Sequence, residues 1–212
     1  KIRSDVESEI NGMGPVIRKE DLELLYEQLD TLKDDDVLVL AGSIPSRMPQ
    51  SIYRDIMSRL QSKRIKIAVD ATKDLLMNVL AYHPFVIKPN NHELSEIFDI
   101  MIDSKEKAVV YAKELQKKGA QNVIVSMAGE GAVFVGSDGS VFTSEAPHGV
   151  VKNSVGAGDS MVAGFLAGYL AKGDYAEAFK MGLCTGSASA FSDQLATREE
   201  VEQVRRSHIF DF

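Results

Sequence analysis

The sequence predicts a doubly wound α/β fold with a mainly parallel sheet, and three observations support this prediction. Short, continuous apolar runs recur along the chain, and such runs are typical of parallel strands buried on both faces. Longer segments between them repeat apolar residues every three or four positions, which indicates helices. Glycine turns at residues 129–131 and 138–139 then separate short strands, which indicates a β-meander attached to the sheet.

The first half of the chain contains the amino-terminal segment and the first strands. Residues 1–15 are predicted to be the remnant of a lid or edge strand followed by a turn, because apolar residues alternate loosely there and Asn11-Gly12 is a strong turn signal. Leucines at helical spacing predict a helix over residues 19–32. Apolar runs predict strands at residues 37–40, 65–70 and 85–88, with helices at residues 49–60 and 75–82 between them.

The second half completes the α/β core, which is expected to span residues 16–212. A helix over residues 104–118 precedes a strand at residues 122–126, and short strands at residues 133–135 and 141–142 form the meander. An apolar segment ending near residue 171 and a small-residue segment over residues 175–191 are predicted to be helices that can approach closely. A short charged helix over residues 199–206 is the last predicted element.

Composition fits one globular domain, or one large and one small, with an ample core. The chain has 212 residues, of which 44% are hydrophobic and 26% charged. Its formal net charge of −7 argues against a nucleic-acid or anionic-membrane surface. The single cysteine, Cys184, excludes a disulfide framework within one chain. No signal peptide is recognised and no apolar run approaches the roughly 20 residues of a spanning helix, so a cytoplasmic location is expected.

The stretch from Asn153 to Phe165 joins a glycine-rich loop to an apolar helix. First-turn amides of a helix attract anions, and Gly156 and Gly158 would let an anionic group approach them closely. Asp159 would repel a phosphate there, so its position makes chemical sense if it accepts a proton from an attacking hydroxyl group. Close helix packing by the glycines, with Asp159 complementing the helix dipole, explains the spacing equally well. Neither a Walker loop nor a dinucleotide fingerprint occurs in the sequence.

Strand exits supply further candidate residues. Gly42 and Ser43 follow a strand at its carboxyl end, where open α/β sheets bind ligands, and are candidates to contact substrate. A turn in which Ser43 bonds only to backbone is the simpler interpretation from position alone, and Asp70 ends its strand at the same sheet edge without an assigned role. Asn90 and Glu93 follow another strand, and their oxygens suit Mg²⁺ held largely through water. A capping box formed by the same two residues explains this spacing as well.

These motifs resemble those of the ribokinase-like carbohydrate kinases, the phosphofructokinase-B family. The similarity covers essentially the whole chain, and the Gly156-Ala157-Gly158-Asp159 motif is its family-specific part. The resemblance implies a ribokinase-like fold. It also implies that Gly156, Ala157 and Gly158 form an anion hole and that Asp159 is the catalytic base.

The same resemblance implies a nucleotide site and a metal site. Asn90 and Glu93 match an N-x-x-E motif that serves Mg²⁺ and phosphate, and Lys88 matches a phosphate-side lysine. The other positions implied to contact the nucleotide are Ser126, Gly131, Ser154, Gly186 and Ser187. Ala128 departs from the family pattern, because a glycine is usual at that position.

The resemblance is closest to the 1-phosphofructokinase branch and implies ATP- and Mg²⁺-dependent transfer of a phosphoryl group to the 6-hydroxyl of fructose 1-phosphate. The implied partners are a small sugar phosphate and ATP, without nucleic acid or membrane, and a homodimer is expected where a full lid is present. Alternatives are a kinase for tagatose 6-phosphate, an inactive nucleotide-binding fragment, and a structural or interaction domain. Because the family's paired-glycine sugar motif and first signature do not occur here, we expect the chain to be the C-terminal part of such a kinase.

Overall fold

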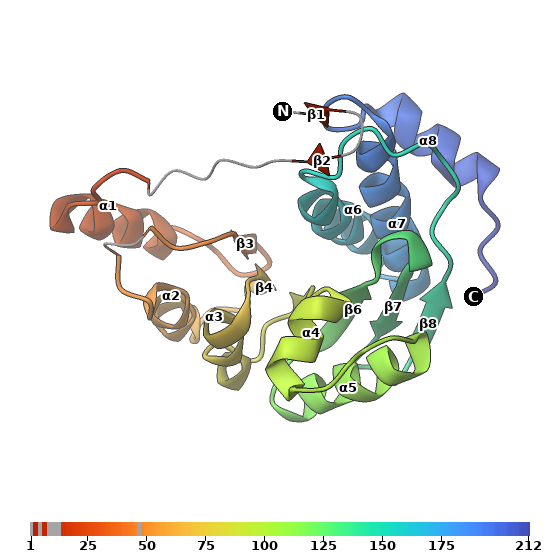
Figure 1. The fold of residues 1–212 in the computed structure, drawn as a ribbon. Coiled ribbons are helices and arrows are strands. Elements are labelled where there is room, and N and C mark those ends of the chain that lie inside the picture. Colours follow the sequence, from red (N-terminus) through yellow and green to blue (C-terminus); the bar gives the residue numbers. More distant parts are fainter. Residues whose placement is uncertain (1, 4–5, 8–13, 46–47) are drawn as a thin grey trace.

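A computed structural model describes residues 2–3, 6–7, 14–45 and 48–212, the first two pairs as backbone only. A six-stranded sheet forms its centre, and neighbouring strands follow the order of the chain (Figure 1). The strands are β3 (Val37–Ala41), β4 (Lys66–Asp70), β5 (Val86–Ile87), β6 (Asn122–Ser126), β7 (Ala132–Val135) and β8 (Val141–Ser144). The strand pairs β3–β4, β4–β5 and β5–β6 are parallel, whereas the pairs β6–β7 and β7–β8 are antiparallel. The predicted mainly parallel sheet with a β-meander is therefore confirmed.

The amino-terminal segment contributes a separate two-stranded sheet. Its strands, β1 (Ile2–Arg3) and β2 (Val6–Glu7), pair in antiparallel fashion. The turn predicted at Asn11-Gly12 lies outside the described residues. The division between a lid remnant at residues 1–15 and a core at residues 16–212 stays a prediction.

Helices occupy the segments that the sequence predicted, with one difference. They are α1 (Lys19–Asp30), α2 (Ile52–Leu60), α3 (Lys73–Met77), α4 (Asn91–Phe98), α5 (Lys105–Lys117), α6 (Ala157–Lys172), α7 (Tyr175–Phe191) and α8 (Arg198–Ser207). The single helix predicted over residues 75–82 is wrong, because α3 ends at Met77 and a separate 3-10 turn covers Leu80–Tyr82. Pro84 disfavours helical geometry at His83, which adopts a left-handed conformation with a φ of 55° before β5.

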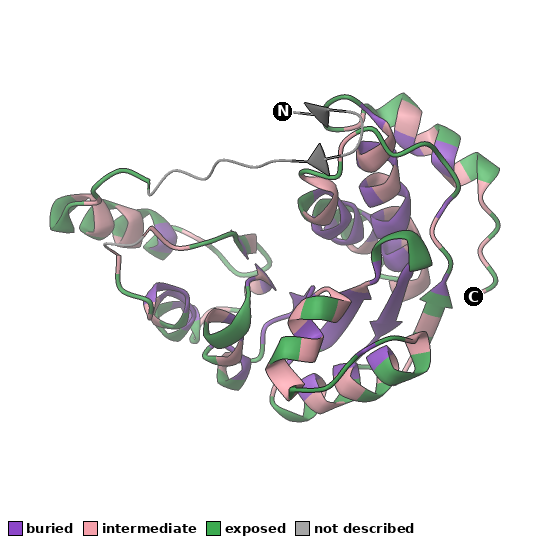
Figure 2. Cartoon of the chain, viewed as in Figure 1, coloured by how far each residue is buried: buried purple, intermediate pink, exposed green. Residues whose placement is uncertain are grey.

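Each face of the sheet is covered by its own set of helices. Side chains alternate along a strand, so Ile67 and Val69 pack into one core while Ala68 between them packs into the other. Helices α1 to α5 cover the first core, and α6 and α7 cover the second (Figures 1 and 2). In the second core the rings of Phe134 and Phe165 are fully buried, with centroids 5.4 Å apart. Burial on both faces explains why the strands appear as continuous apolar runs.

Small residues allow α6 and α7 to approach each other closely. A Cβ atom at Gly186 would lie 3.1 Å from the carbonyl oxygen of Ala157 at the beginning of α6. Three residues further along α7, the buried hydroxyl of Ser189 donates to that of Ser160 over 2.8 Å. Close packing of the two helices is therefore sufficient to explain a glycine at position 186, and the sequence predicted such an approach. The same contacts hold the amino-terminal end of α6 in place.

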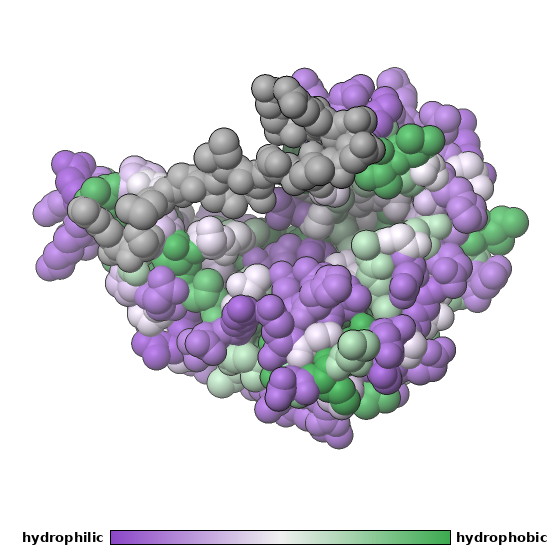
Figure 3. Space-filling view, in the orientation of Figure 1, coloured by the Kyte–Doolittle hydropathy of each residue, from purple (hydrophilic) through white to green (hydrophobic). Residues whose placement is uncertain are grey.

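The face of the molecule shown in Figure 3 is mostly hydrophilic, with apolar residues in scattered small groups. Within the part of the chain that the structure describes, no helix has both the length and the apolar character needed to cross a membrane.

Candidate functional site

The amino-terminal end of α6 has a geometry that suits an anion, as the sequence predicted. Gly156 is its N-cap and has a φ of 80°, a left-handed conformation that favours glycine. The amide of Ala157 donates to the carbonyl oxygen of Ser154 over 3.2 Å. The amides of Gly158 and Asp159 follow in the first turn, where a helix provides no acceptor of its own. These amides and the positive end of the helix dipole suit a bound anion.

Asp159 lines a cavity of about 280 Å³, which we call the acidic cavity. Its lining residues are Val39, Ala41, Gly42, Asp70, Asp159, Val162 and Ala163. Gly42 was predicted to contact substrate and lies here, with a φ of 85° and its amide donating to the Asp70 carbonyl oxygen over 3.1 Å. Ser43, the other candidate, is exposed and is not among the lining residues. The structure therefore brings Asp159 together with Gly42, and it adds Asp70.

A buried ion pair joins the acidic cavity to the end of α6. Asp70 ends β4 and Lys88 follows the neighbouring parallel strand β5, and the Lys88 Nζ lies 3.1 Å from the Asp70 Oδ2. The Lys88 side chain is only 7% exposed and that of Asp70 17%. A Cβ atom at Gly158 would lie 3.1 Å from the Lys88 Nζ, a tight contact that glycine avoids. Lys88 is thus placed beside the predicted anion hole.

Asp70 is the residue of this cluster to which sequence reasoning assigned no role. Burial raises the pKa of its carboxyl group, the Lys88 ammonium opposes this effect, and the charge of Asp159 raises the pKa further. The net shift in the pKa of Asp70 is upward, and burial is its largest cause. The sequence offered one signal for a role of Asp70, namely its place as the last residue of a buried strand. The strand register that brings Asp70 to Lys88 could not be read from the sequence.

Asn90 and Glu93 form the capping box that the sequence allowed. The Asn90 amide N–H donates to Glu93 Oε2, and the Glu93 amide N–H donates to Asn90 Oδ1, both over 2.8 Å. This box fixes the beginning of α4 beside the strand exit. Among the described side chains, no group of three or more histidine, cysteine, aspartate or glutamate residues could hold a metal ion. A metal role for Asn90 and Glu93 therefore stays a prediction.

A larger cavity, of about 630 Å³, lies on the other side of the α6 terminus, and we call it the large cavity. Five residues predicted to contact nucleotide line it, namely Asn90, Ser126, Ser154, Gly186 and Ser187. A parallel bridge between Asn90 and Ser126 holds two of them side by side. Residues 145–149 and Phe191 also line the cavity, and sequence reasoning missed them. Their only signal was the Pro147-His148-Gly149 turn chemistry between a strand and the glycine motif.

Two residues near the large cavity have positive φ angles. Gly131 is not a lining residue, and a Cβ atom there would lie 2.0 Å from the carbonyl oxygen of Ser144, next to the lining segment 145–149. Its φ is 89°. Ala128 does line the cavity and has a φ of 48°, a conformation that costs an alanine about 1 kcal/mol. This is the position at which the chain departs from the family's glycine.

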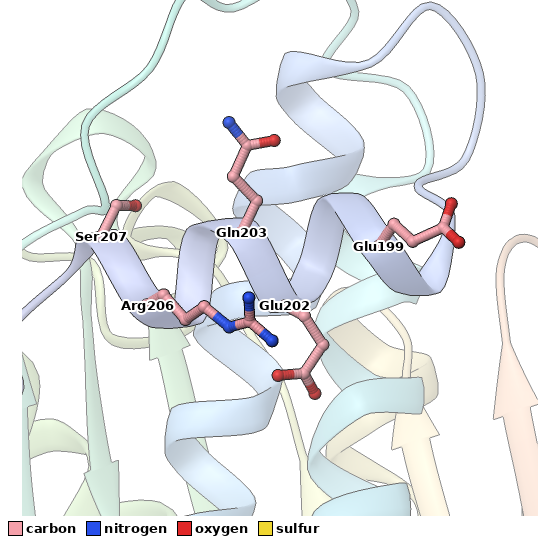
Figure 4. Close-up of a pocket in the computed structure, with 5 residues that line it drawn as sticks. All are labelled: Glu199, Glu202, Gln203, Arg206 and Ser207. Carbon is pink, nitrogen blue, oxygen red and sulfur yellow. The ribbon is translucent and has the colours of Figure 1, made fainter.

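A further hollow lies on α8 and differs from both cavities in its construction. Figure 4 shows its lining residues, Glu199, Glu202, Gln203, Arg206 and Ser207, all of which come from this one helix. None of them was predicted as a site residue. Because no second element contributes a lining side chain, the hollow does not qualify as a candidate active site.

The acidic cavity and the large cavity each have a lining residue in the first turn of α6. Ala157 lines the large cavity, and Asp159, two residues later, lines the acidic cavity. Gly158 lies between them, with the Lys88 ammonium group beside it. A group passing from a ligand in one cavity to a ligand in the other would cross an anion site next to a carboxylate. This geometry suits phosphoryl transfer to a hydroxyl group.

Comparison with known proteins places this arrangement in a family. The family model described as pfkB family carbohydrate kinase matches residues 2–200. The chain belongs to the pfkB family of carbohydrate kinases.

Individual relatives agree with that placement. A 1-phosphofructokinase of Bacillus subtilis is 44% identical over 204 residues, which cover 96% of this chain and 67% of the relative. A D-tagatose-1-phosphate kinase of Bacillus licheniformis is 28% identical over 203 residues, covering 95% of this chain and 66% of the relative. The structure of Escherichia coli phosphofructokinase-2 with substrates and products has a TM-score of 0.82 at 26% identity, covering 89% of this chain and 62% of that one. The chain therefore spans about two thirds of the length of the relatives that it matches.

Proposed function

We propose that this chain carries the catalytic base and the nucleotide site of a kinase that transfers the γ-phosphoryl group of ATP to the 6-hydroxyl of fructose 1-phosphate. The observation that supports it most is the place of Asp159, which lines the acidic cavity two residues after Ala157, a lining residue of the large cavity. The name of the Bacillus subtilis relative supports this substrate. The product would be fructose 1,6-bisphosphate.

In this proposal the sugar phosphate occupies the acidic cavity and ATP occupies the large cavity. The Asp159 carboxylate accepts the proton of the 6-hydroxyl group while the oxygen of that group bonds to the γ-phosphorus. The bond from this phosphorus to the bridging oxygen breaks, and ADP leaves with the electron pair. First-turn amides of α6, from the predicted anion hole at residues 156–158, and the Lys88 ammonium group stabilise negative charge on the transferring group.

The oxygens of Asn90 and Glu93 fit a magnesium ion held mainly through water. The capping box occupies Asn90 Oδ1 and Glu93 Oε2 with one donor each, and both oxygens have a second lone pair. Magnesium keeps several waters and uses one or two protein carboxylates, so Glu93 can serve as the charged group. When bound, the ion would neutralise charge on the phosphate oxygens.

A second candidate is the same reaction with tagatose 1-phosphate. It is favoured by the name of the Bacillus licheniformis relative, which specifies the 1-phosphate and not the 6-phosphate considered from the sequence. Among the described residues that line the acidic cavity, only Asp70 and Asp159 have polar side chains. Among the lining side chains, these two carboxylates are therefore the groups available to distinguish the two sugars. The homodimer expected through lid strands likewise stays a prediction.

The test is ADP release by the 212-residue chain with ATP and MgCl₂, in the presence of fructose 1-phosphate, tagatose 1-phosphate or no sugar. Release that depends on fructose 1-phosphate is the expected result. Preference for tagatose 1-phosphate would favour the second candidate. Binding of ATP without turnover of either sugar would contradict kinase activity of this chain and favour a nucleotide-binding fragment. Absence of ATP binding would overturn the nucleotide site as well.

A further inference from the structure

We infer that Asp70 is a positioning residue that holds the Lys88 ammonium group against the amino-terminal end of α6. The inference rests on the proposed function, because it assigns that ammonium group to the phosphates of ATP. It adds to the proposed function a residue to which no motif in the sequence gave a role.

The ion pair with Asp70 and burial of the side chain restrict the position of the Lys88 ammonium group. The Asp70 Oδ2 lies 3.1 Å from the Lys88 Nζ, and the side chain is only 7% exposed, so it has little room for other rotamers. On the side of α6 the ammonium group lies beside Gly158, 3.1 Å from the position that a Cβ atom would take there. The pair therefore keeps the charge beside Gly158, in the first turn of α6.

The pairing of Lys88 with Asp70 affects how well Asp159, the proposed base, can accept a proton. Two carboxylates, those of Asp70 and Asp159, line one cavity, and the charge of Asp159 raises the pKa of Asp70. Lys88 pairs with Asp70, and no ion pair to Asp159 occurs among the described residues. A lysine bound to Asp159 would weaken it as a proton acceptor. Pairing with Asp70 leaves the Asp159 carboxylate to the acidic cavity and the ammonium group to the phosphates.

Charge and position make opposite predictions for the substitution Asp70→Asn. Coulomb's law alone predicts tighter binding of ATP, because a negative charge near the phosphates is removed. Positioning predicts weaker binding, because the ammonium group loses the partner that fixes it. The sign of the change therefore separates a positioning role from a merely electrostatic one.

The experiment measures the dissociation constants of ATP with MgCl₂ and of adenosine by calorimetry, for the 212-residue chain and its variants. Asp70→Asn is expected to weaken ATP binding about 10-fold, the value of one charge-assisted hydrogen bond, and to leave adenosine binding within about 2-fold. The double variant Asp70→Asn/Lys88→Met should bind ATP no more weakly than Lys88→Met alone. The control Asp30→Asn, which removes a carboxylate from a surface pair with Arg59, should change neither ligand.

Several outcomes would overturn the inference. Equal or tighter ATP binding by Asp70→Asn would show that Asp70 does not position Lys88, while ATP binding by the unaltered chain would preserve the nucleotide site. Equal loss of ATP and adenosine would show a merely structural role. If circular dichroism shows Asp70→Asn to be unfolded, the variant Asp70→Glu is tested in its place. It keeps the negative charge but displaces the ammonium group, and unchanged ATP binding by Asp70→Glu would also overturn the inference. No ATP binding by the unaltered chain would instead overturn the proposed function.

Discussion

The acidic cavity and the large cavity share one end of α6 but are built from different kinds of structure. In the acidic cavity the polar side chains come from the ends of regular elements, Asp70 from β4 and Asp159 from α6. The large cavity is lined in good part by loops, including residues 145–149. Strand and helix ends are fixed by hydrogen-bonded ladders, whereas loops depend on the conformations of single residues. The carboxylates of the acidic cavity are thus held on regular elements, and the shape of the proposed nucleotide pocket depends on loop backbone.

The largest expected effect is on turnover, from Asp159→Asn in the acidic cavity. Loss of the proton acceptor should lower the rate of phosphoryl transfer by about 10²–10⁴-fold, while ATP binding stays within a few-fold of the unaltered chain. Steady-state ADP release and calorimetric ATP titration check this prediction. Parallel losses of turnover and ATP affinity would contradict the assignment of Asp159 as base.

The next effect is on stability, from Gly131→Ala beside the large cavity. A methyl group there would lie 2.0 Å from the Ser144 carbonyl oxygen, so the backbone must shift, and we expect a loss of about 3 kcal/mol in the free energy of unfolding. The matched control is Gly139→Ala, because Gly139 has a similar φ of 87° but no neighbour within 4 Å of the place that an added methyl group would take. It should lose only the conformational cost of about 1–2 kcal/mol. Urea unfolding measures both, and equal losses would refute the steric explanation.

A smaller effect is expected at the junction of the two cavities, from Gly158→Ala. The added methyl group would lie 3.1 Å from the Lys88 Nζ and would intrude on the anion site. ATP affinity should fall about 10-fold and adenosine affinity should be unchanged, because only the phosphates are displaced. Ala167→Ser, an exposed change on the same helix, is the control. A similar loss for both ligands would place the effect on folding and not on the anion site.

The smallest expected effect is Ala128→Gly in the loop that lines the large cavity. Glycine removes the cost of a φ of 48° but adds chain entropy to the unfolded state, so a net gain of about 0.5 kcal/mol is expected. The same substitution at Ala171, an exposed helical position, should destabilise by up to about 1 kcal/mol. Thermal unfolding compares the two, and destabilisation by Ala128→Gly would show that the loop does not store this strain.

The motif Asn90-Asn91-His92-Glu93 shows where local information ends. Its spacing was compatible with a capping box and with a metal site, and the structure forms the box. A capping box depends only on four consecutive residues, so sequence reasoning could propose it. Whether a magnesium ion also binds there depends on phosphate oxygens that another molecule supplies, and the spacing of the motif cannot decide it.

The sequence by itself determined the order and type of most elements, but not the break between α3 and the 3-10 turn at Leu80–Tyr82. It also determined the position of the Gly156–Asp159 motif, since such features depend on local periodicity and on backbone conformation. It also indicated that strand exits would carry the site. Only the tertiary structure decided that Asp70 meets Lys88, because that pairing requires the register of β4 against β5. Only it decided that residues 145–149 line the large cavity with Gly186 and Ser187, because segments far apart in the chain meet there through packing.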